Sequence, residues 1–315
     1  MTAQRRFRPE PGWQDFRATF AAQQSQLVTL QLANDLITPL GAYMQCGKAH
    51  DYAFIIESVE GGQHLGRYSV VGMAPDLVWR CQRGTAHITH HHETPGNPED
   101  GSQSLSGIES LKQLHTDSLI DIVPEHLPPM AASGLFGNLG YDMVREIEAI
   151  PDNNPDTLGL PDATMIRPSR MIVFDNSKHT ITLSVPIYHH AGNSAKDAES
   201  IYEQARDALD NMVEQLNHAS ATQIAQVPSI ETVKRAMAEL NVQANMDRIT
   251  YRDIVERCRD YIYSGDVFQV LPSLRFHFTP GCSGLDMYRA LRRVNPSPFM
   301  FYLKFDDFEL LGASP

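Results

Sequence analysis

The stretch from Tyr52 to Ile88 constrains the fold most, because it predicts several β-strands in succession with no helix between them. Runs rich in β-branched and aromatic residues alternate there with glycine-containing turns, and they read YAFIIESV, RYSVVG, LVWRC and TAHIT. A second group, MIVFD and TITLSV, lies between Met171 and Pro186 around the turn-like Asn176-Ser177-Lys178. Strands joined by such short turns pair antiparallel.

Helices separate the strand groups. The helix expected over residues 196–217 repeats its apolar residues on one face: Ile201, Ala205, Ala208, Met212 and Leu216. A short helix with Ser283 and Asp286 at its start precedes two further strands, FMFYLKF and FELLGAS. Runs of antiparallel strands with helices between them predict an α+β fold, in which antiparallel sheets pack together and are flanked by helices.

A third helix is expected to begin at Thr250, where Asp253 completes a capping box, and to end at Gly265. The period then changes to two, which predicts a strand over residues 267–278 with Pro272 at a bulge or an edge. Its polar face carries Gln269, Ser273 and Arg275. An arginine there could pair with a carboxylate, but the pattern alone favours an ordinary solvated face.

Three segments are predicted as loops or linkers, because they lack apolar periodicity and are rich in Pro, Gly and small polar residues: 90–106, 151–161 and 217–229. We expect the chain to divide near the last of them, into residues 1–230 and residues 231–315.

Composition excludes some partners. The net charge is −12 and the acidic residues are dispersed, so nucleic acid and membrane surfaces are poor partners. The four cysteines show no CxxC spacing, which fits reduced thiols. No apolar segment resembles a signal peptide or a membrane span. We expect a cytoplasmic protein.

Histidines are the first candidates for metal binding. His87, His90, His91 and His92 lie close together, as do His189 and His190. Adjacent histidines that run into a loop seldom hold the fixed geometry of a metal site, so we favour a solvated loop and expect no metal site in this chain. The common nucleotide-binding, hydrolase and metalloprotease motifs are not present.

Five blocks, spread from about residue 33 to the end of the chain, are more specific than any single motif. They read ANDLITPLGAY, IIESVEGGQHLGRYSVVG, GLFGNLGYDMVREIE, SGDVFQVLPSLRF and VNPSPFMFYLKF through LLGASP. In order and spacing they resemble the anthranilate synthase and related chorismate-utilising family. The resemblance implies that family's α+β fold. Residues 1–230 then form the region with the inhibitor-binding strands, and residues 231–315 begin the chorismate-binding catalytic domain.

The resemblance also implies an activity: chorismate and ammonia are converted to anthranilate and pyruvate with Mg²⁺, and a glutamine amidotransferase component II supplies the ammonia. Water-using relatives place a lysine where this chain has Gln269, and an amide cannot deprotonate water. Gln269 is therefore a possible active-site residue of an ammonia-using enzyme. Two alternatives stay open, namely component I of aminodeoxychorismate synthase and a tryptophan-binding regulatory module without catalysis.

Family members of the anthranilate type bind L-tryptophan as a feedback inhibitor between two strand elements. The first corresponds here to Ile55-Ile56-Glu57-Ser58 and the second to Pro298-Phe299-Met300. The resemblance thus implies an inhibitor site made of Glu57, Ser58, Pro298, Phe299 and Met300. Phe299 stands where the family has tyrosine. Without the resemblance, both strands would be taken as ordinary core.

The family's chorismate-binding Gly-Thr turn, lyase-step histidine and Mg²⁺-binding glutamates all follow its Gly-Ala-Ser-Pro element. This chain ends at Pro315 within that element. We therefore expect the 315-residue chain to be inactive alone, with neither catalytic residues nor metal ligands of its own. A continuation reading PIAGT would favour the anthranilate branch, and PIKGT the aminodeoxychorismate branch.

Overall fold

The computed structural model describes residues 7–58, 66–91, 101–128, 134–188, 197–218, 231, 234–235 and 239–314. They belong to two compact units, each described here by itself. One consists of Met1–Thr222 with Gly284–Pro315, and the other of Gln223–Ser283. The strands at the end of the chain therefore pack with its first part. The expected domain division at residue 230 stays a prediction.

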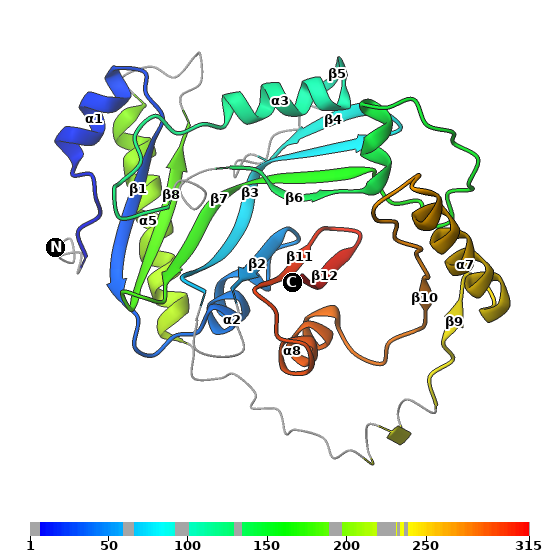
Figure 1. Cartoon of the computed structure of the whole chain (residues 1–315). Coiled ribbons are helices and arrows are strands. Elements are labelled where there is room, and N and C mark those ends of the chain that lie inside the picture. Colours follow the sequence, from blue (N-terminus) through cyan, green and yellow to red (C-terminus); the bar gives the residue numbers. More distant parts are fainter. Residues whose placement is uncertain are drawn as a thin grey trace. The chain divides into compact units, whose positions relative to one another are not determined.

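The larger unit is built on one antiparallel sheet, which has ten strands among the described residues (Figure 1). Its main path runs β1-β8-β7-β3-β2-β11-β12. These strands are β1 Gln26–Ala33, β8 Thr180–Ile187, β7 Ala163–Asp175, β3 Tyr68–Gln82, β2 Ala53–Glu57, β11 Phe299–Lys304 and β12 Glu309–Ser314. The remaining three are β4 Thr85–His90, β5 Gly101–Ser106 and β6 Phe136–Leu139. The α+β class with antiparallel strands and flanking helices is confirmed, and the strand groups join in one large sheet.

The longest strand, β3, combines two runs that were predicted as separate strands. It pairs with β7 from Tyr68 to Cys81, and its register shifts between Pro75 and Leu77. Ala74 has a positive φ of 49° at this point. A bulge at the proline bends the strand without ending it, because β7 continues to supply hydrogen-bond partners on the far side.

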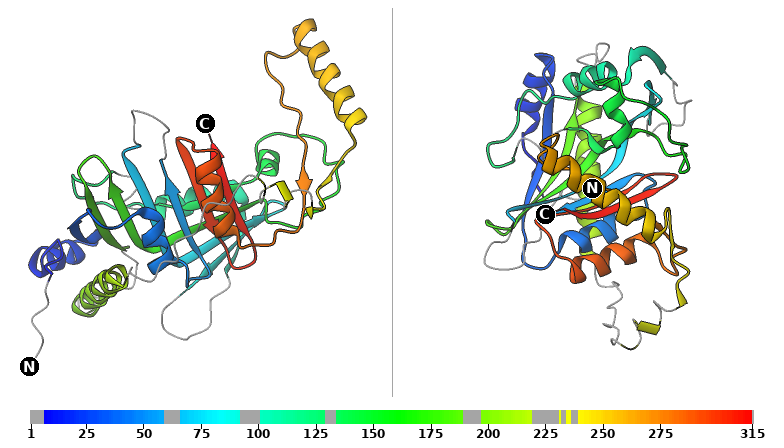
Figure 2. Two further views of the ribbon diagram at one scale, coloured as in Figure 1. Left: turned by 90° about the horizontal axis from the view of Figure 1, so that it is seen from below. Right: turned by 45° about the vertical axis from the view of Figure 1, so that its right-hand side comes forward.

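Helices cover one face of the sheet (Figure 2). They are α1 Trp13–Ala21, α2 Pro39–Ala42, the π-helix η1 Tyr43–Gly47, α5 Ala198–Asn217 and α8 Gly284–Val294. The predicted helix over residues 196–217 is confirmed, and Ala205, Met212 and Leu216 of its apolar face are buried. The predicted helix after Ser283 is confirmed as well. The apolar faces of these helices are buried against the strands and form the main core.

The opposite face carries a second core cluster that includes Phe54 and Val173, covered by residues such as Ile120 and Leu127. A third cluster surrounds the fully buried Trp79 beneath α3 Gly107–Asp117 and the 3₁₀-helix η2 Tyr141–Glu146. The indole Nε1 of Trp79 donates a hydrogen bond of 3.0 Å to Ser110 Oγ. This bond satisfies the only polar atom of the indole.

The structure confirms one of the three predicted loops and contradicts part of another. Residues 151–161 form neither helix nor strand, as predicted. The prediction for 90–106 was wrong over residues 101–106, which form β5 and pair with β4. The free edge of β4 offers hydrogen bonds that the polar composition of the segment did not reveal. Residues 92–100 and 219–229 lie outside the described part of the chain.

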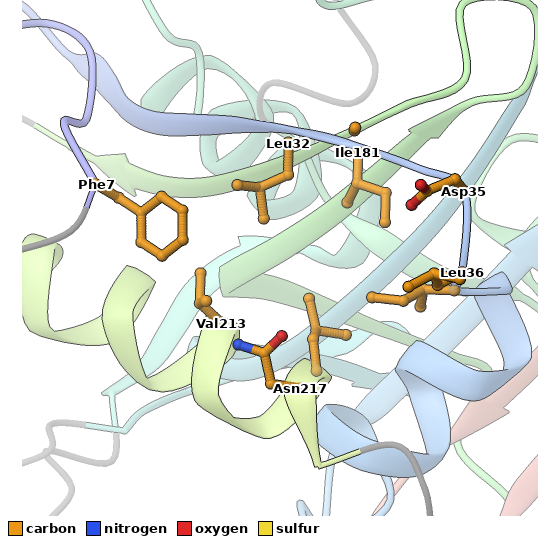
Figure 3. Close-up of a pocket in the computed structure, with 10 residues that line it drawn as sticks. Phe7, Leu32, Asp35, Leu36, Ile181, Val213 and Asn217 are labelled. Carbon is orange, nitrogen blue, oxygen red and sulfur yellow. The ribbon is translucent and has the colours of Figure 1, made fainter.

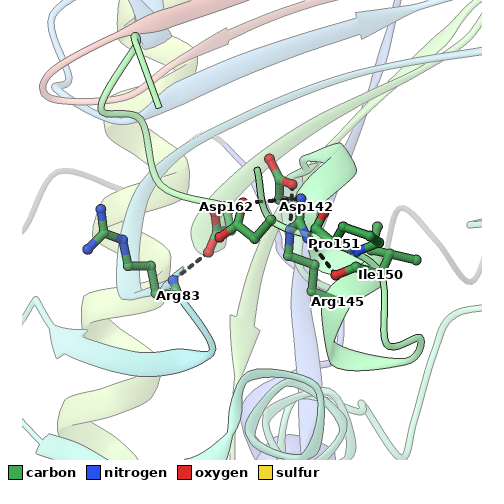
Figure 4. Close-up of polar contacts among 7 residues, drawn as sticks. Arg83, Asp142, Arg145, Ile150, Pro151 and Asp162 are labelled. Atoms are coloured by element: carbon green, nitrogen blue, oxygen red, sulfur yellow. Dashed lines mark hydrogen bonds and ion pairs between the residues drawn. The ribbon is translucent and has the colours of Figure 1, made fainter. Parts of the chain in front are cut away.

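η2 is fixed by polar contacts to the loop that follows it (Figure 4). Arg145 Nε donates to Asp142 Oδ1 at 2.9 Å, and its Nη1 donates to the carbonyl oxygens of Ile150 and Pro151 at 3.1 and 2.9 Å. Nearby, the backbone N–H of Arg83 donates to Asp162 Oδ2. The bonds from Arg145 to Ile150 and Pro151 hold the start of the loop after η2, which has no secondary structure of its own.

In the smaller unit, the described elements are β9 Gln243–Ala244, α7 Arg248–Ser264 and β10 Phe276–His277. The helix begins earlier than predicted, because Asp247 Oδ1 accepts hydrogen bonds from the backbone N–H groups of Ile249 and Thr250 at 2.8 and 2.9 Å. Its end at Gly265 is confirmed, with a left-handed φ of 82°. The strand predicted over 267–278 was wrong except for β10, which pairs with β9. In the described part of the chain no helix is long and apolar enough to cross a bilayer.

Candidate functional site

The two elements predicted to form the inhibitor site are neighbouring strands. β2 and β11 pair antiparallel, and Glu57 stands opposite Met300. Extending this register by one residue places Ser58 opposite Phe299, just beyond the ladder. Segments more than two hundred residues apart in the sequence thus meet at one end of a strand pair. Whether they bind an inhibitor stays a prediction.

The predicted residues differ in exposure. Met300 is fully buried at 0% and belongs to the main core, whereas 61% of Phe299 is exposed. Ser58 and Pro298 are half-buried. The Ser58 side chain lies against Gly66, where an added Cβ would come within 1.6 Å of the serine oxygen. An exposed aromatic ring and a half-buried serine thus lie together at this strand end, and a planar apolar ligand with polar groups suits such a surface.

Glu57 has a different environment, with only 2% of its surface exposed. Arg292 of α8 forms a two-point ion pair with it: Nη2 donates to Oε1 at 2.9 Å, and Nε lies 2.8 Å from Oε2. The hydroxyl of Tyr288 donates to Oε2 at 2.7 Å. Burial and the neighbouring carboxylate raise the pKa of Tyr288, so this hydroxyl remains a donor. Both carboxylate oxygens therefore have partners.

Arg292 and Tyr288 were not identified from the sequence as partners of Glu57. Tyr288 was assigned to the apolar face of its helix, where its ring is indeed buried. Its hydroxyl and the guanidinium four residues later project from the same side of α8, because i and i+4 positions are neighbours. The sequence did offer a signal for this contact: a tyrosine and an arginine four residues apart on a helix, and a glutamate at the end of a buried strand.

The loop between α8 and β11 is fixed at a second point. Ser297 is buried, and its hydroxyl donates a hydrogen bond to the backbone carbonyl of Ser314 in β12. Pro298 follows directly and leads into Phe299. The loop 295–298 therefore has a defined path before it reaches the strand end.

Gln269 lies in the smaller unit, between α7 and β10. It is exposed and belongs to neither helix nor strand. The side-chain alternation expected around it, with Ser273 and Arg275 on one face, does not apply to an irregular segment. Its role as an active-site residue stays a prediction.

The described residues hold no group of three or more His, Cys, Asp and Glu side chains that could bind a metal ion. His87 and His90 lie on β4, and His91 follows it. His92, His189 and His190 lie outside the described residues. Since the residues present offer no cluster for the Mg²⁺ that the resemblance implies, we derive no chemical step through it.

A cavity of about 250 Å³ lies at the other side of the larger unit (Figure 3). The end of β1, the start of β8 and the last turns of α5 form its apolar walls, which include Leu32, Ile181 and Val213. Asp35 and Asn217 are its polar lining residues. None of the sequence-predicted site residues lines it, so it is separate from the β2–β11 site.

A family model described as chorismate binding enzyme matches residues 64–315, and the chain therefore belongs to this family. The sequence resemblance is confirmed at this level. Over 310 residues the chain is 38% identical to anthranilate synthase component 1 of Cereibacter sphaeroides, which covers 96% of the chain and 58% of the relative. Over 286 residues it is 31% identical to the protein of the same name from Pseudomonas putida, covering 89% and 54% respectively.

Among solved structures, anthranilate synthase component I from Streptococcus pneumoniae is similar with a TM-score of 0.61 and 23% identity. The match covers 90% of this chain and 57% of that protein. It supports the fold described above. The chain spans somewhat more than half the length of the relatives it matches.

Proposed function

We propose that the protein containing this chain acts as component I of an anthranilate synthase, which converts chorismate and ammonia to anthranilate and pyruvate in the cytoplasm. The observation that carries the proposal is the 38% identity to an anthranilate synthase component 1 across 96% of the chain. The same name recurs among the other relatives, which favours this branch over aminodeoxychorismate synthase.

The proposal includes ammonia from a glutamine amidotransferase component and Mg²⁺ as cofactor. Gln269 supports ammonia as the nucleophile, because its amide cannot act as the general base that a water-using enzyme needs. The metal would act as a Lewis acid toward the substrate. Its ligands are not expected among residues 1–315.

We further propose that the end of the β2–β11 pair binds L-tryptophan as a feedback inhibitor. Phe299 offers an exposed ring to an indole, and Ser58 offers a hydroxyl to the amino-acid head group. A ligand at this site inhibits only if it favours a conformation in which the catalytic part is misaligned. A tryptophan-binding module without catalysis is the second candidate, and the same site supports it.

The test uses the full-length protein with chorismate, ammonium and Mg²⁺, and follows anthranilate fluorescence. We expect turnover in proportion to protein concentration, inhibited by tryptophan. Formation of 4-amino-4-deoxychorismate would assign the other branch, and tryptophan binding without any product would assign the regulatory module. The 315-residue chain serves as a comparison, and we expect it to give no signal above an enzyme-free control.

A further inference from the structure

We propose that Glu57 is a positioning residue, which Arg292 and Tyr288 hold in place, and that its carboxylate does not pair with the ammonium of the bound amino acid. We call Glu57, Tyr288 and Arg292 the Glu57 clamp. The clamp sets the spacing between Ser58 and the loop 295–298, on which ligand affinity depends. The proposal rests on the tryptophan site of the proposed function.

The charge of Glu57 is compensated within the protein. The Glu57 carboxylate is buried and already receives the guanidinium of Arg292 and the hydroxyl of Tyr288. Because only 2% of Glu57 is exposed, a ligand ammonium could reach the carboxylate only if one of these side chains moved away. Leaving either member of a buried ion pair without its partner is strongly unfavourable. The negative charge of Glu57 is therefore compensated before any ligand arrives.

Glu57 also connects the two ends of the loop 295–298. Arg292 lies in the last turn of α8, immediately before the loop 295–298, and Met300 lies just after that loop. Glu57 contacts both sides, because its carboxylate binds Arg292 and its backbone stands opposite Met300 in the ladder. Both ends of the loop are thus attached to one residue, whose chain neighbour is Ser58. A ligand held between Ser58 and Phe299 depends on this attachment.

The deciding experiment is a double-mutant cycle between protein and ligand, measured by calorimetry on the full-length protein. The protein change is Glu57→Gln, and the ligand change is from L-tryptophan to indole-3-propionate, which lacks the ammonium. A direct contact would show as coupling between the two changes. We expect Glu57→Gln to weaken both ligands by the same factor, roughly tenfold, because preorganisation of the site is lost in both cases.

A smaller change isolates the clamp. Tyr288→Phe removes one hydroxyl that touches Glu57, and we expect it to weaken tryptophan binding by roughly fivefold. The matched control is Tyr302→Phe. Tyr302 is also buried, its ring lies 5.8 Å from that of Tyr288, and its hydroxyl interacts with Tyr43 and Glu309 instead. Tyr302→Phe should leave the affinity unchanged.

Two results would overturn the proposal: a Glu57→Gln effect that disappears with indole-3-propionate, or Tyr288→Phe binding tryptophan as well as wild type does. If wild type binds no tryptophan, the result counts against the proposed inhibitor site. Hydrogen exchange without ligand then still tests whether the Glu57 clamp holds the loop. The backbone amides of Asn295, Ser297, Phe299 and Met300 should exchange faster in Glu57→Gln and Tyr288→Phe than in Tyr302→Phe. Equal exchange in all three would show that the clamp does not hold the loop.

Discussion

The guanidinium of Arg67 meets the carboxylate of Asp175 where β3 begins and β7 ends, with Nη2 3.1 Å from Oδ2. Oδ1 of Asp175 also accepts hydrogen bonds from the backbone N–H groups of Ser177 and Lys178 at 3.1 and 3.2 Å. Asp175 therefore joins the entry to β3, the end of β7 and the turn toward β8. Burial alone would raise its pKa, but Arg67 and the two backbone donors outweigh burial and lower it.

This lowered pKa makes the contribution of Asp175 to stability dependent on pH. A carboxyl group with a depressed folded-state pKa stabilises the fold fully above its unfolded pKa, which is about 3.9, and loses the effect as pH falls through the folded value. Wild type should therefore be more stable than Asp175→Asn at neutral pH, and the difference should shrink only in the acid range below about pH 4. Urea unfolding of both proteins at several pH values measures it. A difference that does not change with pH would contradict the role of the charge.

Gly137 in β6 provides a test of close packing between strands. A Cβ there would lie 1.9 Å from the backbone carbonyl oxygen of Thr164 in β7, so Gly137→Ala must push the two strands apart. We expect a loss of about 1 to 3 kcal/mol or more in the free energy of unfolding. Gly281→Ala is the control, because nothing lies within 4 Å of a Cβ at that position. If the two variants unfold alike, β6 does not pack against β7 as described.

Ser58→Arg should raise the tryptophan concentration needed for half-inhibition of the full-length protein by roughly tenfold or more, since the long side chain fills the accessible strand end. Turnover without tryptophan should change little. Ser200→Arg, on the exposed face of α5, adds the same charge elsewhere and controls for it. If the inhibition curves of wild type and Ser58→Arg coincide, tryptophan does not bind at the end of the β2–β11 pair.

Met300→Thr acts differently from Ser58→Arg, because Met300 is fully buried in the main core. Replacing it with threonine removes apolar volume and buries a hydroxyl, at a cost of about 2 to 4 kcal/mol. We expect weaker inhibition by tryptophan together with a lower unfolding temperature. Weaker inhibition at unchanged stability would mean that Met300 touches the ligand and contributes little to the core.

Gln269→Lys tests the proposed choice of nucleophile. In the full-length protein it should lower the ammonia-dependent rate at least severalfold and introduce a water-derived product, since a lysine of lowered pKa can act as a general base. Gln24→Lys, at an exposed position between α1 and β1, is the matched control. Chromatography of the products distinguishes the two routes. Unchanged rate and products would show that Gln269 does not line the active site.

The elements that were predicted well are those whose apolar pattern is visible within the element itself. The amphipathic α5 and the strand pairs around the β7–β8 turn form wherever their apolar faces can be buried. The predicted start of α7 at Thr250 was wrong. Aspartate and threonine are both common capping residues, and only the hydrogen bonds of Asp247 identify it as the cap.

The strand expected over 267–278 shows a different limit. Alternation of apolar residues does not make a strand unless a neighbouring backbone supplies hydrogen bonds. Among the described residues, only the short segment 243–245 does so for residues 267–278. At the candidate site, the sequence indicated the strands but not the partners of Glu57. An ion pair between residues 57 and 292 depends on the register of β2 against β11 and on how α8 packs, which no local pattern encodes.

The position of β12 at the end of the strand order has a practical consequence. Among the described residues it pairs only with β11, so the backbone groups along its outer side are available to another strand. Open edges of this kind favour joining of sheets between molecules. Molecules that expose this edge should therefore associate edge to edge as their concentration rises, and a charged or proline substitution on β12 should keep them apart.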